Sequence, residues 1–256
     1  MEQITWVIII AIPVIYAIVF HEVAHGYVAY RYGDPTAKLK GRLSLNPIVH
    51  IDLVGTILLP AILLITKAPV LFGWAKPVPV NFSNLRDPKK HMAFVSLAGP
   101  ATNFTLAILC LILIKIIHMI QPEVFIIVKE VSKDTYQFVN LPPKNFMTSI
   151  LKPLARMLPI ALFANVGLGL LNLIPILPLD GGRILTSVLP HSIARRYAKI
   201  EPFGIFILIL IIMSGGIVIL TYPLGWILQT MSALTNSELD AILSHINIAI
   251  EIIFAK

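Results

Sequence analysis

Two histidines with a glutamate between them, in the run His21-Glu22-Val23-Ala24-His25, form the strongest chemical signal in the chain. On a helix, residues four apart lie on one face about one turn apart, so both imidazoles can reach one metal ion. Glu22 lies beside them and can act as a base on a water molecule, because zinc lowers the pKa of such a water to about 7. The spacing therefore predicts a hydrolytic zinc centre, with His21 and His25 as ligands and Glu22 as the catalytic base.

A third ligand must come from elsewhere in the chain, since a catalytic zinc usually takes three protein ligands and keeps one position open. Only 13 residues are acidic, and Asp180 is the outstanding candidate among them. It follows an apolar run at 157–179 and precedes Gly181 and Gly182, which permit close approach of the backbone. Asp-Gly is also common in turns, but together with the histidine pair Asp180 is better interpreted as a ligand. We expect one Zn²⁺ per chain.

The composition indicates a membrane protein. Of the 256 residues, 57% are hydrophobic and 13% are charged, whereas soluble domains are about a quarter charged. Several apolar runs approach or exceed the roughly 18 residues needed to cross a bilayer, and ionisable groups directly after such a run are usually functional. The net charge is +7, and the basic residues lie in short loops between apolar runs, as expected from the positive-inside bias. We therefore expect a lipid bilayer and no nucleic acid as partner.

The predicted fold is an all-α, multi-pass helical bundle with one membrane-embedded domain over residues 1–256. Its core is expected at 4–221 and a C-terminal tail helix at 237–254. Apolar runs that favour core helices lie at 4–30, 92–120, 157–179 and 203–221. Between the first and second core helices, alternating and Pro-rich stretches predict a short β-hairpin or a re-entrant segment.

The ligands constrain the topology, because they must meet at one metal ion. His25 and Asp180 both lie near the C-terminal ends of their apolar runs, so these ends must share a leaflet and the two helices must run parallel. Residues 92–120 supply one crossing between them, and residues 53–66 are then expected to re-enter or pack without crossing. Nine Lys and Arg residues in 31–90 and four in 183–203, against five in 121–156 that three acidic residues partly offset, favour a site toward the cytoplasmic side of a prokaryotic membrane.

Three motifs occur in a fixed order: HEVAH, then AGPATN, then NLIPILPLDGGR. Over roughly residues 15–190 they resemble the site-2 protease family of intramembrane zinc metalloproteases, in its compact branch without PDZ or CBS domains. The resemblance implies that the chain hydrolyses peptide bonds within transmembrane segments of membrane proteins, as in regulated intramembrane proteolysis. It implies the ligands and base named above, and it also places Asn172 near the catalytic centre.

Two asparagines are tentative substrate-binding residues. Asn172 could donate a hydrogen bond to a developing oxyanion, or it could form an interhelical hydrogen bond. Asn103 is the weaker candidate, because Ala98 and Gly99 before it favour close helix packing instead. Alternating segments near 39–45 and 76–82 could supply a strand edge for an unwound substrate.

Two other functions fit some of these features. A zinc-binding membrane protein without proteolytic activity would retain the ligands, but it would not need Glu22. A transporter would also have intramembrane charges and interrupted helices, but transporters are often built from repeated halves. We see no repeat in the sequence, and the protease is the better interpretation.

Overall fold

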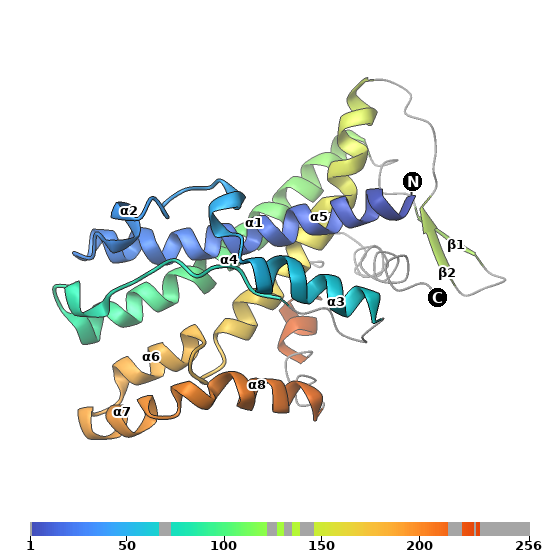
Figure 1. The fold of residues 1–256 in the computed structure, drawn as a ribbon. Coiled ribbons are helices and arrows are strands. Elements are labelled where there is room, and N and C mark those ends of the chain that lie inside the picture. Colours follow the sequence, from blue (N-terminus) through green and yellow to red (C-terminus); the bar gives the residue numbers. More distant parts are fainter. Residues whose placement is uncertain are drawn as a thin grey trace. The chain divides into compact units, whose positions relative to one another are not determined.

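The computed structural model describes residues 2–66, 73–121, 127–130, 135–138, 146–214, 222–227 and 229–230 (Figure 1). The α-helices are α1 (Glu2–Arg31), α2 (Thr36–Leu39), α3 (Leu59–Ile65), α4 (Pro88–Ile120), α5 (Phe146–Asn172), α6 (Asp180–Val188), α7 (His191–Ala198) and α8 (Gly204–Met213). Shorter helical turns are η1 (Pro47–His50), η2 (Leu53–Leu58), η3 (Phe82–Asn84) and η5 (Glu201–Phe203), and the two strands are β1 (Ile127–Glu130) and β2 (Thr135–Phe138).

Within the part of the chain that the structure describes, three helices are long and apolar enough to cross a membrane. They are Val7–Arg31 of α1, α4 and α5, with 25, 33 and 27 residues, and a span needs about 20. The helices expected at 4–30 and 92–120 are thereby confirmed, as is the mostly helical, multi-pass membrane character of the protein.

The apolar run at 157–179 is not one continuous helix. Helix α5 begins earlier, at Phe146, and ends at Asn172. Residues 173–179 form an irregular loop, and Asp180 is the first residue of α6. Pro175 and Pro178 explain the break, because neither can donate a helical hydrogen bond and each ring clashes with the preceding turn.

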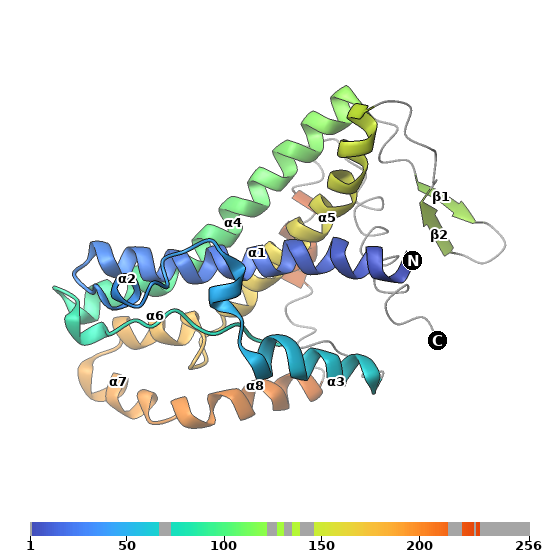
Figure 2. The ribbon, with the colours of Figure 1, turned by 45° about the horizontal axis from the view of Figure 1, so that its top comes forward.

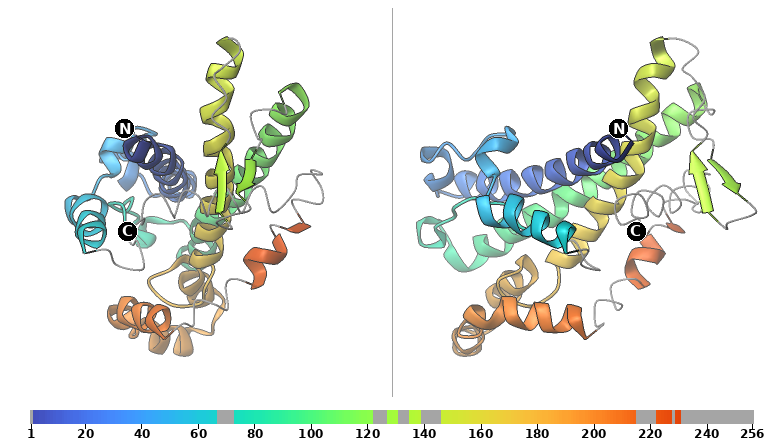
Figure 3. Two further views of the ribbon diagram at one scale, coloured as in Figure 1. Left: turned by 90° about the vertical axis from the view of Figure 1, so that its right-hand side faces the viewer. Right: turned by 45° about the vertical axis from the view of Figure 1, so that its right-hand side comes forward.

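The chain falls into two compact units. The first contains Met1–Ile15, Thr105–Val166 and Gly225–Lys256, and its two described strands pair antiparallel from Ile127–Phe138 to Glu130–Thr135 (Figure 3). The second, which we call the metal-site unit, contains Tyr16–Phe104 and Gly167–Leu224. In this unit, α7 and α8 follow one another with α6 beside α7 (Figure 2). The single domain over 1–256 stays a prediction, and the tail helix at 237–254 lies outside the described residues.

The predicted β-hairpin between the first two core helices is not supported. Residues 32–66 and 73–87 contain no strand, and the only strand pair of the described chain lies later, at 127–138. Residues 73–81 are extended but unpaired, since Pro77 and Pro79 have no N–H to donate. Residues 53–65, by contrast, form the continuous helical stretch η2–α3. At helical rise this stretch is about 20 Å long, so a non-crossing segment here stays a prediction.

Asp34 ties the end of α1 to the chain before α4. Its buried carboxylate accepts hydrogen bonds from the Asn81 backbone N–H at 2.7 Å, the Asn84 amide at 2.9 Å and the Thr36 N–H at 3.1 Å. Burial alone would raise the pKa of Asp34, but the hydrogen bonds from Thr36, Asn84 and Asn81 outweigh it and hold the pKa below its usual value. The chain after α1 is thereby held against η3, which precedes α4.

Candidate metal centre

The structure brings the three predicted ligands together. The Nε2 atoms of His21 and His25 each lie 3.2 Å from Asp180 Oδ2 and 3.0 Å from one another. Both histidines are buried, and the side chain of Asp180 is 12% exposed. Metal ions are commonly held by His, Cys, Asp and Glu side chains. Within the described residues, this trio is the one group of three or more of them close enough together to share an ion.

Both imidazole rings are fixed through Nδ1. His25 Nδ1 lies 2.7 Å from the carbonyl oxygen of Val95, and His21 Nδ1 lies 2.6 Å from Asn103 Oδ1. The Asn103 amide is itself oriented, because its Nδ2 donates to the Ala17 carbonyl at 3.2 Å. Since oxygens accept at both Nδ1 atoms, the protons must sit there, and the Nε2 lone pairs face Asp180. Hydrogen bonds of this kind typically orient histidines that bind metal.

The arrangement of these atoms fits a zinc ion. Asp180 Oδ2 is buried and receives no hydrogen bond within the described chain, although both Nε2 atoms are within ion-pair distance. Three electron-rich atoms facing one another repel unless a cation lies among them. Tetrahedral zinc with bonds of about 2.0 Å has neighbouring ligands about 3.3 Å apart, close to the 3.0–3.2 Å separations observed.

Gly99 lets α4 approach the histidine pair. A Cβ atom at this position would lie 2.4 Å from His25 Nε2 and 2.5 Å from His21 Cε1. Any other residue would therefore push into the space between the ligand atoms. The sequence indicated close helix packing at AGPATN, and the structure shows that Gly99 packs against the side chains of His21 and His25.

We expect Gly99→Ala to weaken zinc binding by about ten-fold to a hundred-fold, the range seen when residues supporting metal ligands are altered. The added methyl group would displace an imidazole from its position. Gly167→Ala is the matched control, because a Cβ there meets nothing within 4 Å. Competition with a chromogenic chelator measures both affinities. Equal zinc affinity in the two variants would contradict the role given to Gly99.

Glu22 is held by an extended segment at residues 73–81. Its Oε2 accepts a hydrogen bond from the Val78 N–H at 2.7 Å, and the carboxylate has no other hydrogen bond within the described residues. Two residues earlier, Lys76 N–H donates to the carbonyl of His50 at 2.9 Å. Arg42, which is buried, donates to the Lys76 carbonyl at 2.6 Å. The segment is thus anchored along one edge of its backbone, and it fixes one oxygen of Glu22.

The loop 173–179 positions Asp180 by folding back on the first turn of α6. A Cβ on Gly181 would lie 2.2 Å from the Leu173 carbonyl oxygen, and one on Gly182 would lie 2.4 Å from the Leu177 nitrogen. Tyr197 of α7 donates to the Pro175 carbonyl at 2.7 Å. The close backbone approach expected at the glycine pair is confirmed.

The two asparagines proposed to bind substrate have different hydrogen-bond partners. Asn172 donates to the carbonyl of Leu168 in its own helix at 3.0 Å, and the structure shows no hydrogen bond from it to the three ligands. Asn103 contacts the site, but through His21, so its amide orients a ligand. Sequence reasoning missed this contact, and the available signal was that Asn103 lies one helical turn after Gly99. A substrate role for either asparagine stays a prediction.

The fold and the site define a class of protein: a multi-pass membrane protein with the donor set of a zinc hydrolase. The model of peptidase family M50 matches residues 9–215, so the chain belongs to this family, the site-2 proteases. It is therefore a zinc metalloprotease that acts within the membrane, as the sequence predicted.

Two curated relatives agree with this assignment. The "Putative zinc metalloprotease YwhC" of Bacillus subtilis is 32% identical over 205 residues, which cover 80% of each chain. The "Putative zinc metalloprotease Rip2" of Mycolicibacterium smegmatis is 32% identical over 91 residues, which cover 36% of this chain and 34% of the relative. No solved structure matches the chain.

Proposed function

We propose that His21, His25 and Asp180 hold the single zinc ion of this protease and that Glu22 is its catalytic base. The observation that carries the proposal is the convergence of two oriented Nε2 atoms on a buried carboxylate oxygen that receives no hydrogen bond within the described chain. The family supports zinc as the metal. A non-proteolytic zinc protein or a transporter is not favoured by any observation in the structure.

Zinc, when bound, supplies Lewis acidity, which activates water and polarises a carbonyl oxygen. Glu22 takes the proton from the attacking water and later delivers it to the leaving amine. The Val78 N–H on Oε2 fixes the rotation of the carboxylate, so that Oε1 is left to meet the water. His21 and His25 keep their protons on Nδ1 throughout, because Asn103 and Val95 accept there.

The substrate is a transmembrane protein whose helix must unwind before water can reach a peptide bond. The extended segment at 73–81 lies beside Glu22 and is the edge that we propose for the unwound chain. Trp74, Lys76 and Val78 already donate their N–H groups within the protein. Pro77 and Pro79 have no N–H, so an unwound substrate would have to donate to carbonyl oxygens there, and the Pro77 carbonyl already accepts from Arg42 at 3.4 Å. These contacts restrict where a substrate could pair along the edge expected near 76–82. The edge expected near 39–45 stays a weaker proposal.

We also propose a prokaryotic cytoplasmic membrane as the location, with the active site toward the cytoplasm. Nine Lys and Arg residues in 31–90 and four in 183–203 support this orientation, against five in 121–156 that three acidic residues partly offset. Both curated relatives are bacterial, which supports the prokaryotic origin.

Removal of the metal tests the proposed function. The full chain would be purified, placed in proteoliposomes and mixed with a transmembrane peptide. Treatment with 1,10-phenanthroline is expected to lower cleavage to about a hundredth or less, because the activated water is lost. Activity should return as about one zinc per chain is restored, and the cut should lie inside the apolar stretch. Cleavage that resists chelation, or cuts confined to the polar ends of the peptide, would contradict the proposal.

A further inference from the structure

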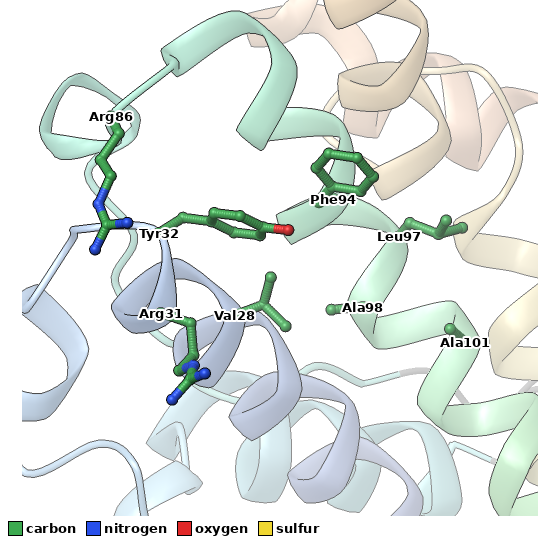
Figure 4. Close-up of a pocket in the computed structure, with 8 residues that line it drawn as sticks. All are labelled: Val28, Arg31, Tyr32, Arg86, Phe94, Leu97, Ala98 and Ala101. Atoms are coloured by element: carbon green, nitrogen blue, oxygen red, sulfur yellow. The ribbon is translucent and has the colours of Figure 1, made fainter.

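A pocket separate from the metal ligands lies on the metal-site unit, between the end of α1 and the start of α4 (Figure 4). Its volume is about 490 Å³, and neither the three ligands nor Glu22 line it. The side chains that line it come from three places: the last turn of α1 with the residue that follows it, the chain just before α4, and one face of α4. They are Val28, Arg31, Tyr32, Arg86, Phe94, Leu97, Ala98 and Ala101.

The pocket has a cationic end and an apolar end. In Figure 4, Arg31 and Arg86 lie at one end, and Leu97 and Ala101 lie toward the other. Tyr32 lies between the two ends. Its ring stacks on His91 with centroids 4.1 Å apart and on Phe94 at 5.7 Å. The lining thus changes from charged to aliphatic along the pocket.

The two arginines are uncompensated. Among the residues that the structure describes, neither guanidinium has an ion pair or a hydrogen bond. Lys89 and Lys90 in the first turn of α4 add to the positive charge and are exposed. Asp87 is the acidic residue beside them, and its carboxylate is used to accept from the Lys90 N–H at 3.1 Å. The cationic end of the pocket is therefore complementary to an anion.

The pocket also lies at the end of a membrane span. Arg31 is the last residue of the candidate span Val7–Arg31, and α4 continues from the pocket into a second one. At such a level a protein meets lipid headgroups on one side and acyl chains on the other. Arginine binds phosphate through planar, charge-assisted hydrogen bonds, and basic pockets between membrane helices bind anionic headgroups.

We propose that this pocket binds an anionic phospholipid. The phosphate lies between Arg31 and Arg86, and the first part of an acyl chain lies against Leu97 and Ala101. The aromatic ring of Tyr32 separates the polar and apolar parts of the ligand. This site is independent of zinc and of the proteolytic reaction.

Native mass spectrometry of the full, purified chain tests the charged end. The protein would be titrated with phosphatidylglycerol and, separately, with phosphatidylcholine of the same acyl chains. We expect tighter binding of phosphatidylglycerol and a loss of about five-fold in its affinity for each of Arg31→Gln and Arg86→Gln, the effect typical of one basic residue near anionic lipid. Lys40→Gln is the matched control, because Lys40 is exposed and does not line the pocket.

The outcomes separate the lipid from simpler explanations. Equal losses in Lys40→Gln and the arginine variants, or no preference for phosphatidylglycerol, would overturn the proposal. Ala101→Phe should fill the apolar end and weaken binding of phosphatidylglycerol as well. If Ala101→Phe leaves phosphatidylglycerol binding unchanged, the acyl chain does not occupy this end and the lipid site is wrong. If inorganic phosphate at the lipid's concentration displaces the lipid, a free anion suffices and the lipid site is wrong as well. The same titration on Glu22→Gln should match the unmodified protein, which keeps this result separate from the protease assignment.

Discussion

Glu22→Gln is expected to lower kcat for cleavage of a transmembrane substrate by about a thousand-fold, while the protein keeps its zinc. General bases contribute about a hundred-fold to ten-thousand-fold to rate, and an amide cannot take a proton from water. Glutamine has the shape of glutamate, and its amide oxygen can still accept from the Val78 N–H. The local structure should therefore survive. Single-turnover cleavage in proteoliposomes, with zinc measured on the same sample, gives both quantities.

Glu201→Gln is the matched control for this variant. Glu201 lies on the same unit, and its carboxylate, 47% exposed, is 3.8 Å from Arg183, so its loss should leave kcat nearly unchanged. If Glu22→Gln cleaved at a normal rate, Glu22 would not be the base. If it lost its zinc instead, Glu22 would have to act on the metal site and not on water.

Asp180→Asn is expected to weaken zinc binding by about a hundred-fold or more and to abolish cleavage at limiting zinc, because a neutral amide is a poor ligand for zinc. The metal-free protein should behave differently. In the structure, Asp180 Oδ2 faces two Nε2 lone pairs without a donor of its own. An asparagine N–H could donate to one of them, so Asp180→Asn should melt at the same temperature as the zinc-free parent or higher.

Asp87→Asn serves as the control for this second variant. Asp87 accepts from the Lys90 N–H at the start of α4, and asparagine caps helices equally well, so zinc affinity should not change. Wild-type zinc affinity in Asp180→Asn would mean that the third ligand is another residue. A lower melting temperature of its metal-free form would contradict the repulsion inferred among the three side chains.

The parts of the site that could be predicted are those encoded by local spacing or by rare residue types. His21 and His25 share a helical face by periodicity alone, and their separation is the same in any straight helix. Asp180 stood out because acidic residues are few and because two glycines follow it. The structure shows what those glycines do: they let the 173–179 loop lie directly against α6.

The parts that could not be predicted depend on backbone groups far away in the sequence. The Val95 carbonyl that orients His25 lies 70 residues from it, and the Val78 N–H that holds Glu22 lies 56 residues away. Every residue type except proline has both groups, so the sequence carries almost no signal for them. Asn103 is different, because a polar side chain on an apolar helix is visible in the sequence, although its contact with His21 was missed.

Alternation misled the prediction of a hairpin between the first two core helices. A period of two predicts an extended chain, and residues 73–81 are extended, but pairing also requires N–H groups on both edges. Pro77 and Pro79 remove them from one edge. On the other edge, the partners are the Gly55 and His50 carbonyls, the Arg42 side chain and Glu22 itself. The extended segment thus holds Glu22, the proposed base, where a strand was expected.

X-ray absorption at the zinc edge tests the central claim most directly, because it reports the ligand atoms of the bound metal. For the full chain with one zinc, we expect two imidazole nitrogens and oxygen ligands at about 2.0–2.2 Å, with no sulfur. The Asp180→Asn protein, forced to full occupancy with excess zinc, should keep both imidazoles and change its oxygen shell. Two results would contradict a site built from His21, His25 and Asp180. One is three or more imidazole ligands, and the other is a sulfur ligand, which only Cys110 could supply as a thiolate, at about 2.3 Å from the zinc.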